Sequence, residues 1–174
     1  MSILEIIKVP NPLLKSISKE VKEFDSVLKN NVKDMYDTLY SSGNGIGLAA
    51  PQVAVMKRII VIDIKENEKS NPLTFINPKI IKKSEETFIN EEGCLSIPEF
   101  YGSVERSKNI SVEWFTENGK LKCSDFQGLM SICLQHEIDH LNGILFIDHL
   151  SKIKRKMAVE KVLKIKKKKK IINK

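Results

Sequence analysis

Residues 136–140 read HEIDH, and this segment restricts what the chain can fold into more than any other. Two histidines four residues apart on an α-helix project from one face, close enough for both imidazoles to bind one metal ion. The carboxylate of Glu137 can then reach a water molecule on that ion. The alternative is a surface helix with two incidental histidines. The metal site is favoured because Leu129, Ile132 and Cys133 continue the histidine face at helical spacing, where unpaired imidazoles are costly to bury.

A metal site of this kind needs a third protein ligand. A metzincin would place a histidine where this chain has Phe146. A protease with a downstream glutamate ligand would use Glu160, which lies among lysines, a poor setting for a buried ligand. Cys94 is the better candidate, because a thiolate binds borderline metals strongly and the adjacent Gly93 lets the backbone turn toward the site. The alternative for Cys94 is a small buried residue without chemistry.

Residues 45–52 read GIGLAAPQ, which matches the G-x-G-x-x-A form of a dinucleotide-binding fingerprint. That fingerprint follows a strand and opens a helix, whereas this segment follows a predicted helix and is interrupted by Pro51. It also lacks the Gly-Lys-Ser/Thr ending of a phosphate loop. A glycine-rich extended segment suits close approach to a peptide-like ligand, with Gln52 supplying an amide. The alternative is a tight loop.

Hydrophobic periodicity predicts an α+β fold. A first helix is expected over residues 25–40, started by Asp25 or Ser26 and ended by Gly43. Strands are expected over residues 58–64, 74–81, 103–116 and 120–126, with a hairpin turn at residues 118–119. The resulting antiparallel or mixed sheets would pack around the helix that carries residues 136–140.

That central helix is expected to start at a capping box formed by Ser124 and Gln127 and to end at residues 142–143. A last helix is expected from about Ser151, fraying at the lysine run of residues 166–170, where like charges repel. With 174 residues and 41% hydrophobic composition, the chain suits one domain. Residues 1–150 would form the catalytic domain, and residues 151–174 a C-terminal helix or tail of the same domain.

The positive charge of the chain is concentrated at its C-terminus. Residues 151–174 contain eleven lysines and Arg155 against Glu160 alone, a net charge of +11. Because the whole chain carries +7, residues 1–150 carry −4. A tail this basic predicts a polyanionic partner, and the alternative is a solvated end without a partner.

Apolar runs and cysteine usage indicate the compartment. The N-terminal apolar residues are interrupted by Glu5, Lys8 and Pro10 before they reach signal-peptide length, and no apolar run is long enough to cross a membrane. The three cysteines are odd in number and widely spaced, which argues against a disulfide framework. We therefore expect a cytoplasmic protein without membrane contact.

Three segments occur in the order and approximate spacing of one known family: GIGLAAPQ at residues 45–52, EGCLS at residues 92–96 and QHEIDH at residues 135–140. On these segments the sequence resembles the peptide deformylases, hydrolases that remove the formyl group from the N-terminal methionine of newly made proteins. The resemblance covers most of the chain, and three motifs in order leave little room for chance.

The resemblance implies roles for particular residues. The metal ligands would be Cys94, His136 and His140. Proton transfer and oxyanion binding would fall to Glu137 as general acid and base, to Gln52 and to the backbone amide of Leu95. The substrate chain and its methionine pocket would be bordered by Ile46, Gly47, Leu129, Ile132 and Cys133. Glu92 would form an ion pair, for which Arg106 is the matching partner in this sequence.

One thiolate and two imidazoles predict one divalent transition metal, and the negative charge of the Cys94 thiolate favours Fe²⁺ as the physiological ion, with Zn²⁺, Ni²⁺ or Co²⁺ as substitutes. The partners would be the formyl-methionine N-terminus of a nascent peptide and, through the basic C-terminal segment, the ribosome near its exit tunnel. The protein would act as a monomer. The sequence departs from many relatives at Tyr101, where they carry an arginine near the pocket mouth. A zinc metalloprotease and a non-catalytic metal-dependent binding module are the alternatives, and Glu137 separates the binding module from both enzymes.

Overall fold

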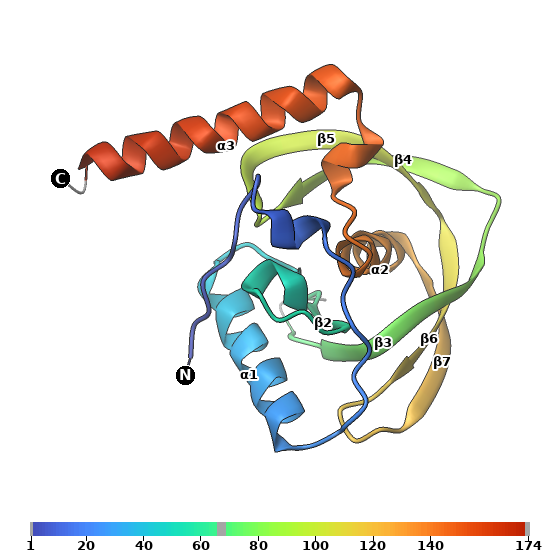
Figure 1. Ribbon diagram of the computed structural model, residues 1–174. Helices are drawn as coiled ribbons and strands as arrows, with labels where there is room; N and C mark the ends of the chain where they lie inside the picture. The colour runs from blue at the N-terminus through green and yellow to red at the C-terminus, as the bar shows by residue number, and fades with distance from the viewer. Residues whose placement is uncertain (1, 66–68, 173–174) are drawn as a thin grey trace.

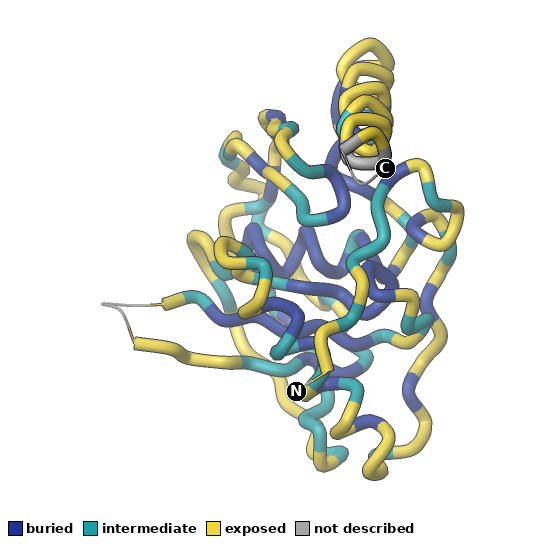
Figure 2. Tube along the Cα trace, turned by 90° about the vertical axis from the view of Figure 1, so that its left-hand side faces the viewer, coloured by how far each residue is buried: buried dark blue, intermediate teal, exposed yellow. Residues whose placement is uncertain are grey.

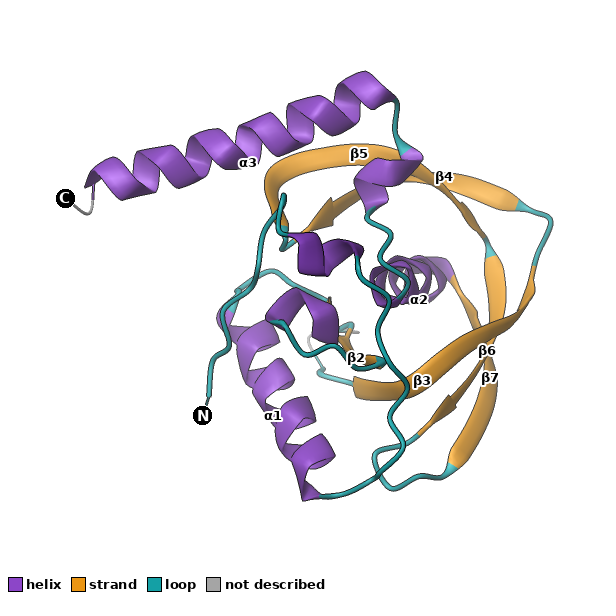
Figure 3. Cartoon of the chain, viewed as in Figure 1, coloured by secondary structure: helices purple, strands orange, loops and turns teal. Residues whose placement is uncertain are grey.

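The computed structural model describes residues 2–65 and 69–172, and its strands curve around one central helix, α2 (Figure 1). Figure 3 shows this helix enclosed by strands, with a long C-terminal helix outside them. The predicted α+β architecture is confirmed. Its helices are α1 (Ser26–Ser41), α2 (Gly128–Leu141) and α3 (Lys152–Ile172), and its 3-10 turns are η1 (Pro12–Lys15), η2 (Ala50–Val53) and η3 (Phe146–His149).

Two antiparallel sheets make up the β-structure of the described residues. The larger sheet has the strand order β1-β2-β3-β6-β7, and the smaller one pairs β4 with β5. Every pairing between these named strands is antiparallel, so neither sheet is mixed. The strands are β1 (Gly47–Ala49), β2 (Ile59–Asp63), β3 (Pro72–Lys83), β4 (Thr87–Cys94), β5 (Ile97–Ser107), β6 (Asn109–Phe115) and β7 (Leu121–Gln127).

Capping and turn residues act largely as the sequence predicts. The Asp25 side chain accepts a hydrogen bond from the Leu28 amide at 3.0 Å and so starts α1. Gly43, just after that helix, has a φ of +83°, a conformation that glycine adopts without strain. The hairpin between β6 and β7 turns at Gly119, whose amide donates to the Thr116 carbonyl at 2.9 Å.

The start of α2 was predicted wrongly. Ser124 lies within β7, paired with Val112, and it caps nothing. The helix begins at Gly128, whose φ is +59°, and the preceding Gln127 makes no side-chain capping bond. The β6–β7 hairpin continues to Gln127, so strand pairing prevails over the local capping pattern.

Two other boundaries differ from the prediction. Residues 103–116 form parts of two strands, because the chain leaves the smaller sheet at Ser107 and joins the larger one at Asn109. The lysine run of residues 166–170 lies within α3, which continues to Ile172. Lysine is a good helix former, and this preference outweighs the repulsion between its charges in solvent.

Buried side chains gather on both sides of α2. One core cluster joins that helix to the larger sheet and includes Phe75, Trp114 and Leu134. Another lies between β5, η3 and α3 and includes Phe146 and Val162. Figure 2 shows buried residues through the centre of the molecule and exposed residues along most of α3. The first cluster also includes Cys133, Ile138 and Leu141 of α2, so this packing fixes the position of the helix and of its polar side chains.

None of the helices in the described ranges is both long and apolar enough to cross a membrane.

Candidate active site

The structure brings Cys94, His136 and His140 together. Both histidines lie on the buried helix α2, and Cys94 ends strand β4 of the smaller sheet. One potential ligand atom from each residue lies within 4.8 Å of the other two. The Cys94 Sγ and the His140 Nε2 are 3.3 Å apart. One thiol and two imidazoles converging in this way form the donor set of a transition-metal site.

Glu92 and Arg106 fix the orientation of His136. The His136 Nδ1–H donates to the Glu92 Oε2 at 2.9 Å, so Nε2 is the ring nitrogen that Glu92 does not engage. Arg106 holds the same carboxylate with two hydrogen bonds, from Nε at 2.8 Å and from a terminal nitrogen at 3.0 Å. Burial opposes ionisation of Glu92, but the hydrogen bonds from His136 and Arg106 prevail and lower its pKa to about 2. The predicted ion pair is therefore present, and it serves the histidine.

Glu137 lies buried beside this cluster. Burial raises the pKa of the Glu137 carboxyl to about 7, with the nearby charge of Glu92 acting in the same direction. Its Oε2 is buried and has no hydrogen-bond partner within the described residues. A carboxyl group with a pKa near neutrality can both take and give a proton at physiological pH.

The two histidines have opposite pKa shifts. Burial opposes protonation of His136, but the neighbouring Cys94 and Glu92 prevail and raise its pKa well above the ordinary value. Burial, followed by the positive charge of His136, lowers the pKa of His140 well below the ordinary value. The His140 Nδ1 is also buried without a hydrogen-bond partner among the described residues.

Gln52 reaches the cluster from η2. Its Oε1 accepts a hydrogen bond from the Ala49 amide at 2.9 Å, which turns its Nε2 toward Cys94. That Nε2 donates to the Cys94 Sγ at 3.4 Å and to the Ser96 Oγ at 3.2 Å. The amide therefore has a fixed direction beside the thiol. Ser96 was not predicted as a site residue, although it belongs to the EGCLS segment that pointed to Cys94.

A cavity of about 480 Å³ opens onto these groups. All five residues predicted to border the substrate line it: Ile46, Gly47, Leu129, Ile132 and Cys133. Leu95 and Tyr101 line it too. A Cβ atom on Gly47 would lie 2.7 Å from the Glu137 Oε1 and 2.8 Å from the Cys133 Sγ. Glycine at this position therefore leaves space for the Glu137 carboxylate.

The other ligand candidates lie elsewhere. Glu160 is half exposed on α3 and pairs with Lys156 at 3.8 Å. Phe146 is buried, and its ring stacks on the His136 ring with the centroids 6.1 Å apart. Phe146 therefore cannot act as the third ligand of a metzincin, and Glu160 is not placed to act as a downstream glutamate ligand.

The chemistry at the cavity floor defines the class of protein. A buried carboxyl group able to exchange a proton near neutral pH, beside a thiol and two imidazoles and open to a peptide-sized cavity, is suited to hydrolysis. The site is thus that of a hydrolase.

Comparisons with known proteins identify the family. The family model "Polypeptide deformylase" matches residues 3–156. A peptide deformylase of Rhizobium meliloti is 47% identical over 165 residues, 94% of each chain. One of Brucella suis is 48% identical over 166 residues, which cover 95% of this chain and 94% of the relative. The crystal structure of peptide deformylase from Ehrlichia chaffeensis has a TM-score of 0.93 and 39% identity, with 97% of this chain and 99% of that one covered.

The chain belongs to the peptide deformylase family. Its function is peptide deformylation, the removal of the formyl group from the N-terminal formyl-methionine of nascent polypeptides. The predicted family and function are confirmed.

Proposed function

We propose that Cys94, His136 and His140 bind one divalent transition metal and that the deformylation depends on it. The converging thiol and imidazoles support this proposal. So does the hydrogen bond from the His136 Nδ1 to Glu92, which leaves Nε2 as the ring nitrogen that would bind the ion. We propose Fe²⁺ as the physiological ion, with Zn²⁺, Ni²⁺ or Co²⁺ as substitutes, because a mixed thiolate and imidazole site accepts borderline metals. When bound, the ion would act as a Lewis acid toward the formyl carbonyl and the attacking water.

In this proposal Glu137 is the general acid and base. Its Oε2 would accept a proton from the attacking water and then donate a proton to the leaving amine as formate is released. The pKa of about 7 and the absence of a competing partner for Oε2 in the described residues support both steps.

Gln52 and Leu95 would stabilise the negative charge on the formyl oxygen. The Gln52 Nε2 is held beside the Cys94 Sγ, and the backbone amide of Leu95 follows Cys94 directly. A single donor in an oxyanion hole contributes about 3 kcal/mol to transition-state stabilisation. The methionine side chain would lie against Ile46, Leu129 and Ile132, which line the cavity together with Gly47 and Cys133.

Substitution of Glu137 by glutamine tests this mechanism most directly, because it removes proton transfer and leaves all three ligands in place. Turnover on a formyl-methionyl peptide should fall about a hundredfold to ten-thousandfold, while metal content stays near one ion per chain. Formate release and elemental analysis measure the two quantities. A Glu137→Gln protein with near-normal turnover would show that the proton carrier is another group.

Cys94→Ala is the complementary variant. It should lose the metal, because it removes the thiolate from a three-residue donor set. Full metal retention by this variant would rule out Cys94 as a ligand.

We also propose that the enzyme acts as a cytoplasmic monomer and docks on the ribosome near the exit tunnel through α3. The concentrated charge of residues 151–174 supports the docking. So does the substrate, a nascent chain that emerges from the ribosome. The lysines at positions 164, 166, 167 and 168 are exposed and available for binding.

A further inference from the structure

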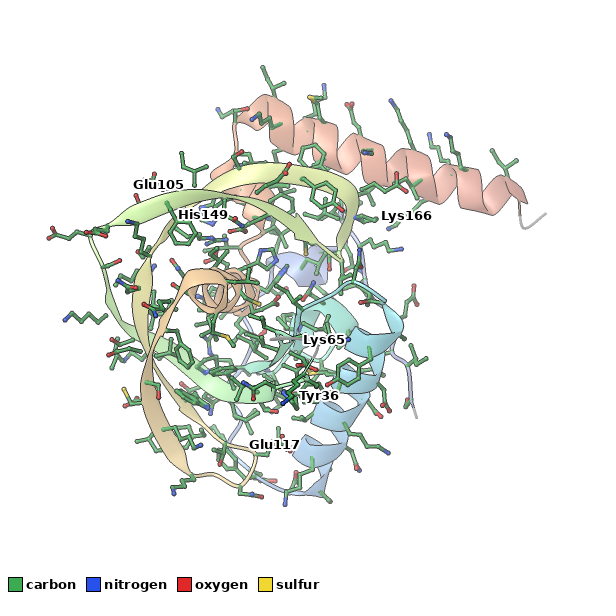
Figure 4. The ribbon with its side chains drawn as sticks, turned by 180° about the vertical axis from the view of Figure 1, so that it is seen from behind. Tyr36, Lys65, Glu105, Glu117, His149 and Lys166 are labelled. Carbon is green, nitrogen blue, oxygen red and sulfur yellow. The ribbon has the colours of Figure 1, made fainter. Side chains whose placement is uncertain are left out.

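His149 and Asp139 form a polar contact beyond the residues assigned to catalysis. His149 ends the short turn η3, and Asp139 lies on α2 between the histidine ligands. The His149 Nε2 is 2.8 Å from the Asp139 Oδ2. Figure 4 shows His149 between α2 and the β4–β5 ribbon. Because a carboxylate only accepts hydrogen bonds, the His149 Nε2 carries the hydrogen and donates it.

Asp139 connects this contact to Arg106. The same Asp139 Oδ2 accepts a second hydrogen bond, from a terminal nitrogen of Arg106 at 2.6 Å. That nitrogen lies 3.5 Å from the His149 Nε2, so two donors converge on one carboxylate oxygen. The Arg106 side chain is 5% exposed, whereas that of His149 is 37% exposed. A partly exposed histidine thus borders a buried guanidinium.

Arg106 continues the connection to the metal-binding side chain. Its remaining donors hold both oxygens of Glu92, which accepts the Nδ1–H of His136. The orientation of the His136 ring therefore depends on a series of four direct contacts that ends at His149. Groups that hydrogen-bond to metal-binding histidines set the orientation and basicity of the ring, and removing such a group commonly weakens metal binding about tenfold to a hundredfold.

We propose that His149 is a positioning residue of the active site, which holds Asp139 against Arg106 and thereby keeps the His136 imidazole directed at the metal. This inference rests on the metal site proposed above. Without the His149 donor, Asp139 has one fewer hydrogen bond and can turn toward solvent, because its side chain is 19% exposed. Arg106 and Glu92 are then held less firmly, and metal is released faster. Since the effect on His136 is indirect, we expect it to be smaller than for a direct partner of the ligand.

His149→Gln and His149→Asn form a matched pair of test variants. The glutamine amide nitrogen can take the place of the His149 Nε2 and donate to Asp139, whereas the asparagine amide is one methylene shorter and does not reach it. The measurement is the rate at which Zn²⁺-loaded protein loses its metal to an excess of chelator. We expect about threefold to tenfold faster release from His149→Asn and a rate within about twofold of the parent for His149→Gln.

Asp148→Asn is the control for a merely structural effect. Asp148 lies in the same turn and pairs with Lys15 and Arg155, not with Asp139. This variant should lower the melting temperature and leave the rate of Zn²⁺ release near that of the parent. Thermal unfolding of all four proteins separates stability from metal retention.

Equal rates of Zn²⁺ release from His149→Asn and His149→Gln would overturn the role of His149. Release from Asp148→Asn as fast as from His149→Asn would overturn it too. These results differ from failure of the metal site itself, in which the parent protein would bind no Zn²⁺ and both proposals would fall.

Discussion

Gly47 shows how a single residue shapes the active site. The position faces the Glu137 carboxylate, and an added methyl group would lie 2.7 Å from the Glu137 Oε1. Gly47→Ala should therefore displace the carboxylate and lower turnover by about a hundredfold, the effect typical of a misplaced catalytic group. Formate release from a formyl-methionyl peptide is the measurement. Unchanged turnover would show that Glu137 does not act from the position it has in this structure.

Two further quantities make the Gly47→Ala result specific. Metal content should stay at the parent level, because the three atoms nearest to the new methyl group belong to Glu137 and Cys133, which are not proposed ligands. The protein should also stay folded, since Gly47 lies in strand β1 and is not among the residues with positive φ. A protein that loses its metal would indicate a wider disturbance.

At this scale the sequence predicted which side chains would converge, and the structure brings Cys94 together with both histidines. The HEIDH segment required a third ligand, and Cys94 was the best candidate on chemical grounds alone. The hydrogen bond between His149 and Asp139 could not be predicted from the sequence. It depends on the chain returning past α2 after Gly143, and nothing local in the sequence specifies that path.

At the scale of elements, the turn η3 is held by ionic contacts to a distant segment, η1, and to the helix that follows it, α3. Asp148 pairs with Lys15 of η1 and with Arg155 of α3, and its carboxylate accepts the Leu145 amide at 2.8 Å. Burial opposes ionisation of Asp148, but the hydrogen bonds from Lys15 and the Leu145 amide prevail and lower its pKa. The folded protein therefore favours the ionised carboxylate.

This shift predicts a pH-dependent effect of Asp148→Asn. A carboxyl group with a lowered folded-state pKa stabilises the fold above its ordinary pKa of about 4, and the contribution disappears as the pH falls through the folded-state value. Asp148→Asn should therefore melt at a lower temperature than the parent at pH 7, and the difference should shrink as the solution is acidified below about pH 4. Thermal unfolding over a pH series measures it. A difference independent of pH would mean that the Asp148 charge does not stabilise the turn.

The strands and their boundaries were the hardest part of the fold to predict from the sequence. β4 was missed because its hydrophobic residues do not follow its alternating burial: Ile89 is exposed, whereas the charged Glu92 is buried. The Glu92 carboxylate can be buried because Arg106 and His136 donate hydrogen bonds to it. The capping pattern at residues 124–127 wrongly predicted a helix start. These residues pair with β6 as part of β7, and a local pattern does not reveal such a long-range contact.

For the whole molecule, α3 presents two different faces. Ala158 and Val162 are fully buried in the cluster formed with β5 and η3. Lys161 donates a hydrogen bond to the backbone carbonyl of Glu99, a residue that lines the cavity. The other face carries lysines, and Figure 4 shows Lys166 far along the helix. The sequence predicted both the helix and its charge, but the hydrogen bond to the cavity rim required the three-dimensional fold.

The exposed face of α3 leads to a prediction about the ribosome. Reversing the charge of Lys164, Lys166, Lys167 and Lys168 to glutamate should weaken ribosome binding by at least about tenfold at physiological salt, because a side chain that no longer neutralises a phosphate no longer releases its counterions. Binding of the parent should fall steeply as salt rises. Activity on a short free peptide should be unchanged, since these four residues do not line the cavity.

A second charge-reversed variant controls for net charge. Lys29, Lys33, Lys82 and Lys83 are also exposed, but they lie on α1 and β3, so their reversal changes the total charge equally and leaves α3 intact. Co-sedimentation with ribosomes over a range of salt concentrations compares the three proteins. We expect loss of binding only for the α3 variant, because docking requires the charge to be concentrated on one helix. The proposed docking would be refuted if the parent did not co-sediment, if the α3 variant bound as tightly as the parent at every salt concentration, or if both variants lost binding equally.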